Sequence, residues 1–174
     1  MHNNLVNLGR AAGMLWLSIG EPRTIEVQSV NGTVKKEVTD YAIHFQCQWR
    51  FVKEGKILLA SHDIYNPYDK NLEWDDDWDW DVFGREKDQS SIFDVHSKRL
   101  INELLPLKIE NIYYTDTYDL HIDFDKKICF DTFITISTKR EFYRFLDHAT
   151  REHTVIFDAT ESQSAAGYIQ RQQK

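Results

Sequence analysis

The residue types best able to do chemistry gather in one acidic and aromatic run at residues 74–81. It reads Trp-Asp-Asp-Asp-Trp-Asp-Trp-Asp, which places five carboxylates and three indoles in eight positions. The carboxylates repel one another, and clustered exposed indoles are uncommon on the surface of a monomer. We therefore expect a bound cation, a partner, or the rest of the chain to offset both.

A divalent cation is one interpretation of this run. The spacing matches the oxygen-ligand positions of a calcium loop, with the candidate ligands Asp75, Asp77, Asp79, Asp81 and Glu86. However, Trp80 stands where such a loop needs glycine, and Pro67 disfavours a helix before the first ligand. Calcium or magnesium is the cofactor that this pattern allows, and no other cofactor is indicated.

A protein partner is a second interpretation. Tryptophan is enriched at binding hot spots, and carboxylates steer a basic partner toward such a surface. Here Trp74, Trp78 and Trp80 would be the anchors, and Asp79 and Asp81 would complement the partner's charge. A third interpretation needs no ligand, because the indoles can cover a sheet edge or core rim while the carboxylates stay in water.

Histidines provide another candidate site. His44 and His62 fall on strands that we expect to pair, with Arg50 and Asp63 nearby in sequence, so the four could line a polar cleft with binding or acid–base chemistry. The solvated face of an antiparallel sheet explains the same residues without a ligand, and it also explains His121 between Asp119 and Asp123. The sequence contains no phosphate-binding glycine loop, GxSxG elbow or HExxH motif, which lowers the expectation of an enzyme.

Composition limits the class of protein. The net charge of −7 and pI near 5.5 argue against a nucleic-acid partner, which would need clustered Lys and Arg. Cys47 and Cys129 lack the spacing of a zinc site or a disulfide framework. The longest apolar run near the N-terminus, residues 14–17, is too short for a signal peptide or a bilayer span, so we expect a cytoplasmic chain without a membrane partner. The oligomeric state stays open.

Alternation of apolar residues predicts the framework that positions these groups. From Tyr41 to Phe51 every second residue is apolar, which predicts one long strand covering a core. It is expected to follow a strand at residues 24–30 through an Asn31-Gly32 hairpin turn, and to pair with a strand at residues 56–61. A helix over residues 4–12 and a strand at residues 14–20 are expected before them.

The second half of the chain shows similar patterns. A helix capped by Ser90 or Ser91 should run to Leu105, and three strands forming a meander should follow from Lys108. Thr138 and Glu141 have the spacing of a capping box, which predicts a short helix before a last strand at residues 154–157. The sequence therefore predicts one α+β domain over residues 1–158. We expect an antiparallel sheet of about six to eight strands, with the main helix on its apolar face and one or two short helices.

Two segments fall outside this framework. Residues 66–87 have no periodicity and form an expected insertion loop that carries the acidic aromatic run. Residues 159–174 form a polar tail that we expect to be disordered.

Several segments resemble a set of small bacterial proteins of unassigned activity. They are YAIHFQCQWR at residues 41–50, ASHDIY at residues 60–65, WDWD at residues 78–81 and Phe93-Asp94. The resemblance covers roughly the first half of the chain and implies that these segments form one recurring unit. Some small acidic bacterial domains are immunity proteins, which suggests by analogy a role of that class.

Together these patterns favour a non-enzymatic interaction protein that binds a basic protein, and the analogy above suggests the immunity type. The alternative is a divalent-metal-binding protein or metal-dependent enzyme that uses the acidic segment at residues 75–86 or the His44, His62 and Asp63 cleft.

Overall fold

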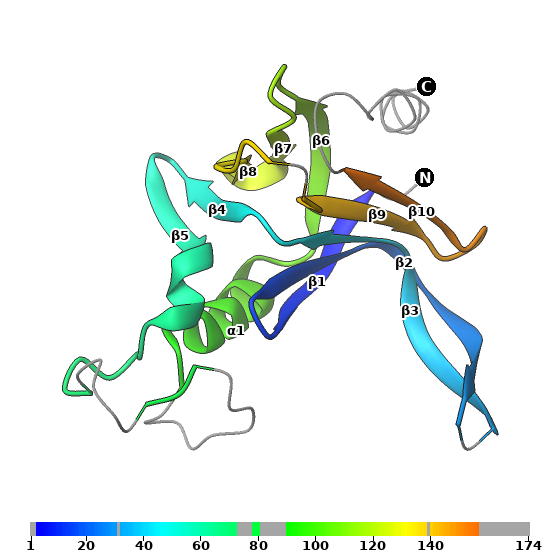
Figure 1. Ribbon diagram of the computed structural model, residues 1–174. Helices are drawn as coiled ribbons and strands as arrows, with labels where there is room; N and C mark the ends of the chain where they lie inside the picture. The colour runs from blue at the N-terminus through cyan, green and yellow to red at the C-terminus, as the bar shows by residue number, and fades with distance from the viewer. Residues whose placement is uncertain (1–2, 31, 73–77, 81–89, 139, 157–174) are drawn as a thin grey trace.

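The computed structural model describes residues 3–30, 32–72, 78–80, 90–138 and 140–156. Within these ranges ten strands and one α-helix follow one another along the chain (Figure 1). The strands are β1 (Asn4–Ala11), β2 (Met14–Ser29), β3 (Gly32–Phe45), β4 (Gln48–Lys53), β5 (Lys56–Ala60), β6 (Leu107–Tyr114), β7 (Leu120–Phe124), β8 (Ile128–Phe133), β9 (Tyr143–Asp147) and β10 (Glu152–Ile156). Helix α1 spans Ile92–Leu104, and the 3₁₀ turns η1 and η3 span Ser61–Tyr65 and Asp125–Lys127.

The strands form one antiparallel sheet in the order β10-β9-β3-β2-β1-β6-β7-β8-β4-β5. It has two halves, joined where β1 pairs with β6 through Asn4↔Lys108 and Leu5↔Leu107. The chain also crosses directly from one half to the other, where β3 ends at Phe45 and β4 begins at Gln48. The expected α+β class is confirmed, while the expected strand number of six to eight is too low.

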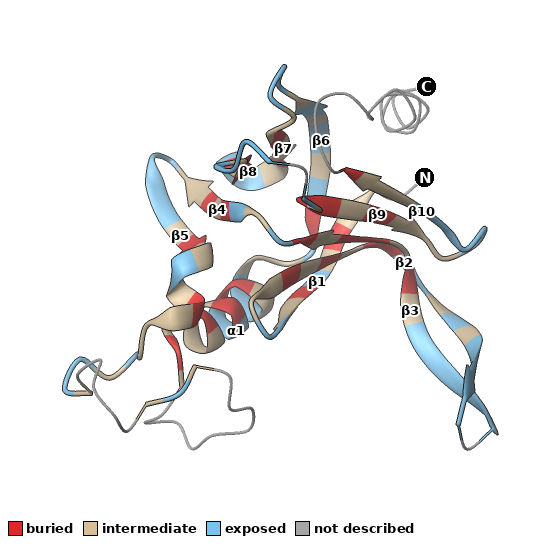
Figure 2. Ribbon diagram, viewed as in Figure 1, coloured by how far each residue is buried: buried red, intermediate tan, exposed pale blue. Residues whose placement is uncertain are grey.

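Aromatic side chains fill the space between the two halves. The Phe45 ring of β3 lies 4.9 Å from Phe130 of β8 and 5.8 Å from Tyr143 of β9. Trp49 of β4 lies 6.0 Å from Phe93 of α1, so the helix contributes to the same core. Buried residues, drawn in red in Figure 2, occur in the strands of both halves and in α1.

Helix α1 begins where the sequence predicts. The Ser91 Oγ accepts a hydrogen bond from the Asp94 N–H, and the Asp94 carboxylate accepts one from the Ser91 N–H, each at 3.1 Å. This reciprocal capping satisfies two amide donors that the first turn leaves unpaired. The hairpin of β4 with β5, the meander of β6 to β8 and a strand at the end of the described chain are confirmed as well. None of the helices in the described ranges is long and apolar enough to cross a bilayer.

The helix expected over residues 4–12 is wrong, because this segment is strand β1. Its pairing with β2 shifts register between Leu5 and Asn7, so Val6 is an extra residue in the ladder. Such a bulge places Leu5 and Leu8 on the same buried face, at a spacing of three that imitates a helix.

The short helix expected after Thr138 is also wrong. Residues Tyr143–Asp147 form β9 between β3 and β10, and the Glu141 carboxylate binds the Arg144 side chain instead of capping a helix. Pairing on both sides of the strand outweighs the local capping pattern.

The long strand expected from Tyr41 to Phe51 is interrupted. The N–H groups of Gln46 and Cys47 both donate to the carbonyl of Phe142, at 2.8 and 3.2 Å, so the ladder breaks between β3 and β4. The expected alternation survives the break, because Ile43, Phe45, Trp49 and Phe51 are all buried.

Candidate functional site

The break between β3 and β4 lies beside a pocket with a volume of about 240 Å³, here called the crossover pocket. Its lining comes from four separate parts of the chain: Gly13, Gln46, Cys47, Gln48, Ser61, His62, Tyr65, Thr135, Ile136, Arg140, Glu141 and Phe142. Gln46 and Gln48 flank the break and are both exposed, and the Gln46 amide donates to Glu141 at 3.0 Å. Most of the other groups are polar, which is typical of a site that orients what it binds.

Tyr65 of η1 forms one wall of the crossover pocket. A Cβ at Gly13 would lie 2.4 Å from the Tyr65 hydroxyl oxygen, so only glycine leaves room for this ring position. The Trp80 ring packs edge-on against Tyr65, with centroids 4.8 Å apart. Trp80 is half-buried in this position, so it packs on its own domain while part of its surface faces solvent.

Arg10 of β1 fixes Trp80 beside the pocket. Its Nη2 donates to the Trp80 carbonyl at 3.1 Å, and its Nε pairs with the Asp94 carboxylate at 3.1 Å. The Arg10 side chain is only 5% exposed. Burial raises the pKa of Asp94, but the hydrogen bonds from Arg10 and Ser91 outweigh this effect and lower it overall. One guanidinium therefore joins β1, the start of α1 and the aromatic wall.

Glu141 lines the pocket and joins Arg144 of β9 to Gln46, the residue that follows β3. Its carboxylate accepts two hydrogen bonds of 2.6 Å from Arg144 and one of 3.0 Å from Gln46. His44 lies directly across the ladder from Arg144. Burial and the positive charge of Arg144 lower the pKa of His44, which favours its neutral form.

A charged row crosses β4, β8 and β7. Arg50 pairs with Asp131 at 3.4 Å and lies over the Phe133 ring at 4.7 Å. The Nδ1 atom of His121 lies 2.6 Å from Asp131, and its Nε2 lies 2.9 Å from Asp123. Because both ring nitrogens face carboxylates, a protonated His121 can donate to both, which favours its charged form.

Two groups at or beside the pocket that could do chemistry are already protonated or engaged. Burial raises the pKa of the Cys47 thiol to about 12, so the thiol stays protonated and is a poor nucleophile. The Asp63 carboxylate accepts a hydrogen bond from the Ala60 N–H at 2.8 Å and caps η1 instead of orienting His62. The pocket thus offers amides, a hydroxyl and aromatic surface to a ligand.

Of the described residues proposed from the sequence, only His62 lines this pocket. The expectation that His44 and His62 lie on paired strands is wrong, because β3 pairs with β2 and β9 while His62 follows β5 in η1. His44 lies opposite Arg144 on β9, and Arg50 lies opposite Asp131 on β8. Trp78 is half-buried and Asp79 exposed, while Trp74, Asp75, Asp77, Asp81 and Glu86 lie outside the described residues. The metal site therefore stays a prediction.

The sequence interpretation missed Tyr65, Arg10 and Asp131. The contact of Asp131 with His121 could have been predicted from the sequence. A turn at residues 125–127 between two predicted strands brings positions 121 and 131 opposite each other. Nothing in the spacing of Arg10 points to residues 80 and 94, which lie far along the chain.

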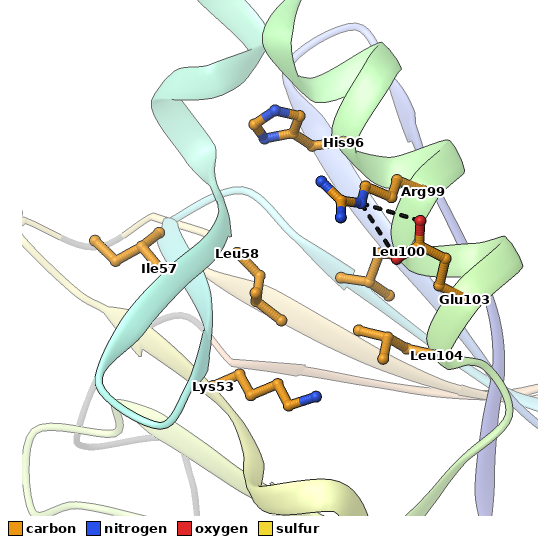
Figure 3. A pocket seen from close by; sticks show the side chains of 8 residues that line it. All are labelled: Lys53, Ile57, Leu58, His96, Arg99, Leu100, Glu103 and Leu104. Carbon is orange, nitrogen blue, oxygen red and sulfur yellow. Dashed lines mark hydrogen bonds and ion pairs between the residues drawn. The ribbon is translucent and has the colours of Figure 1, made fainter.

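A groove between β5 and α1 is larger, with a volume of about 340 Å³ (Figure 3). Leu58, Leu100 and Leu104 line it, and on its rim Arg99 pairs with Glu103 at 3.0 Å. Both partners of this pair are more than half exposed. Lys53 and His96 also line this groove, but the crossover pocket has the more polar lining and remains the stronger candidate.

Comparison with known proteins gave no match: no protein-family model, curated protein or solved structure matches this chain. The resemblance to small bacterial proteins therefore stays a prediction.

The charged row predicts a pH-dependent stability. Burial opposes the charged form of His121, but hydrogen bonds to Asp123 and Asp131 prevail and raise its pKa above the ordinary value of 6.5. The stabilisation should thus be complete below about pH 6.5 and disappear as the pH rises through the folded-state pKa. Replacing His121 by Asn is expected to cost about 1–2 kcal/mol at pH 5.5 and clearly less at pH 9.

Urea unfolding across this pH range checks the expectation, with His153→Asn as the control because His153 is exposed on β10. A loss from the His121 variant that stays constant with pH would show that the imidazolium does not stabilise the row.

Proposed function

We propose that this chain is a non-enzymatic interaction protein that binds a basic protein partner, and that the crossover pocket receives an anchor side chain of that partner. One observation carries the proposal. The fold brings polar side chains from three separate segments around a single pocket and packs Trp80 against the Tyr65 wall. Aromatic surface beside a pocket with a few polar groups is the usual composition of a binding hot spot.

Electrostatics supports a basic partner. The chain carries a net charge of −7, and Asp79 lies exposed next to Trp80. Such a field raises the association rate of a positively charged protein and becomes weaker as salt screens it. The immunity-type role that the sequence suggests has the same physical basis, because an inhibitor of this kind covers a partner's surface without doing chemistry on it.

The proposal is tested by changing two glutamines in the same way. Gln48→Arg places a bulky cation in the crossover pocket, while Gln28→Arg makes the same change at an exposed position of β2 far from it. A partner captured from native lysate should bind the pocket variant at least about tenfold more weakly, a loss of about 1.4 kcal/mol. The control variant should bind it as the unmodified chain does.

Salt provides a second readout in the same experiment. Capture by the unmodified chain should weaken as the NaCl concentration rises, because the attraction is partly electrostatic. A partner that binds both glutamine variants equally well would contradict the role of the pocket, whatever its salt dependence.

A further inference from the structure

The sheet ends at strand β5, which has a paired neighbour on one side only. Within the described ranges β5 pairs with β4, from Arg50↔Ala60 to Lys53↔Lys56, and no strand follows it in the sheet order. An edge strand presents a row of backbone N–H and C=O groups without partners, which can template the addition of another strand. Ile57 on this strand is 59% exposed, so the edge also offers apolar surface.

Helix α1 lies beside β5 and forms with it the groove of about 340 Å³ (Figure 3). The helix contributes residues spaced three and four apart, which share one face of a helix: His96, Arg99, Leu100, Glu103 and Leu104. Leu58 points from β5 toward Leu100 and Leu104, which gives the groove an apolar centre (Figure 3). An extended peptide suits a groove between an edge strand and a helix, because its backbone can pair with the strand while every second side chain enters the groove.

The end of the groove near the turn between β4 and β5 is positively charged. Lys53 lies with Leu104 at this end (Figure 3), and it stands directly opposite Lys56 in the ladder. Like charges at directly opposite positions destabilise a sheet. Glu54 in the turn does not offset them, because it pairs with Lys127 at 3.1 Å. The ion pairs of the described residues include neither Lys53 nor Lys56.

The negative groups on the helix side of the groove are also engaged. Glu103 pairs with Arg99 at 3.0 Å, so these two charges compensate each other. The last carbonyl of α1, that of Leu104, accepts a hydrogen bond from Lys126 Nζ at 2.6 Å, which offsets the negative end of the helix dipole. The two lysines beside the turn therefore give the groove a positive end, although the whole chain carries a net charge of −7.

We propose that β5 receives an extended segment of another protein as an added antiparallel strand, with an apolar side chain in the groove and acidic residues at the C-terminal end of the segment. The described strands all pair antiparallel, and this orientation brings the C-terminal end of the segment beside Lys53 and Lys56. Carboxylates there offset the repulsion between the two lysines, while the apolar side chain covers Leu58, Leu100 and Leu104. The groove shares no lining residue with the crossover pocket, so this is a second binding surface beyond the proposed function.

Synthetic peptides that differ only in charge test the proposal on the full chain. Each has about eight residues, is blocked at both ends and alternates leucine with threonine. The acidic peptide ends in aspartates, and the control peptide ends in lysines. The acidic peptide should bind saturably and at least about tenfold more tightly than the control. Charge acting without a site would give the opposite order, because the chain is acidic overall.

The same titration reports the role of the peptide backbone and the location of the site. N-methylation of the acidic peptide at every second residue removes the donors of one edge. Methylation of the edge that faces β5 should abolish binding, while methylation of the other edge should preserve it. In amide NMR spectra of the chain, the resonances of residues 56–60 should shift on binding. A nitroxide at the C-terminal end of the peptide should broaden Lys56 more than Ala60, as antiparallel addition requires.

Lys53→Glu should reverse the preference between the two peptides, whereas Lys35→Glu, the same change at an exposed position of β3, should leave it unchanged. Equal binding of both peptides or of both methylated forms, no saturation up to about 1 mM, or shifts confined to residues outside β5 and α1 would overturn the proposal. The peptide comparison uses the unmodified chain and therefore does not depend on how the lysine variants fold. Gln48→Arg should leave peptide binding unchanged, which separates this proposal from the one for the crossover pocket.

Discussion

Replacing Arg10 by methionine is expected to lower the free energy of unfolding by about 3–5 kcal/mol. The change keeps most of the apolar stem but removes a guanidinium that is 5% exposed, and it leaves Asp94 without its cation at the start of α1. It also removes the donor that holds the Trp80 carbonyl. Urea unfolding followed by circular dichroism measures the loss.

The surface pair Arg99–Glu103 supplies the matched control for this prediction. Its side chains are 74% and 58% exposed, so Arg99→Met should cost less than about 0.5 kcal/mol. A loss below about 1 kcal/mol from the Arg10 variant, close to that of the control, would show that the buried arginine does not hold the aromatic wall in place.

Trp49→Ala should be similarly damaging, with an expected loss of about 3–5 kcal/mol. The indole is 2% exposed and contacts Phe51, Phe93 and Phe130, so alanine leaves a cavity where the two halves of the sheet meet α1. Thermal or urea unfolding of the variant measures this effect.

Trp49→Phe separates the effect of the indole N–H from the effect of the ring volume. Its buried N–H has no hydrogen-bond partner among the described residues, and such a group carries an uncompensated desolvation cost. Phenylalanine removes that cost while keeping most of the ring volume, so we expect a loss of less than about 1.5 kcal/mol. A loss as large as that of the alanine variant would mean that the N–H finds a partner in solution.

The sequence predicted elements whose pattern is local. Helix α1 has its capping serine and apolar stripe within one segment, and the meander from β6 to β8 has its turns between alternating strands. The buried residues of β3 and β4 followed from the same alternation, even though the strand breaks at Gln46 and Cys47.

Predictions failed where pairing with distant residues decides the conformation. The bulge at Val6 gives β1 the spacing of a helix, and only its partner β2 identifies it as a strand. Tyr143–Asp147 became β9 because strands on both sides bind it, against the local capping pattern. The wrong pairing of His44 with His62 had the same origin, since the sequence could not show that β3 and β4 have different neighbours.

The candidate site was predictable only in part. His62 was a candidate from the sequence, although it was grouped with His44 through a strand pairing that is wrong, and Trp80 was proposed separately as a partner anchor. Tyr65 and Arg10 are needed to complete the wall, and their contacts depend on chain segments brought together by the fold. A single sequence carries no spacing signal for such contacts.

Site-specific photo-cross-linking tests the central claim, that the crossover pocket is a binding surface for another protein, most directly. A photoreactive amino acid replaces either His62, exposed in the pocket, or His153, exposed on β10, and both variants are irradiated in native lysate. We expect position 62 to yield one discrete cross-linked basic protein, which excess unmodified chain competes away, and position 153 to yield none. The same products from both positions, or none from position 62, would contradict the claim.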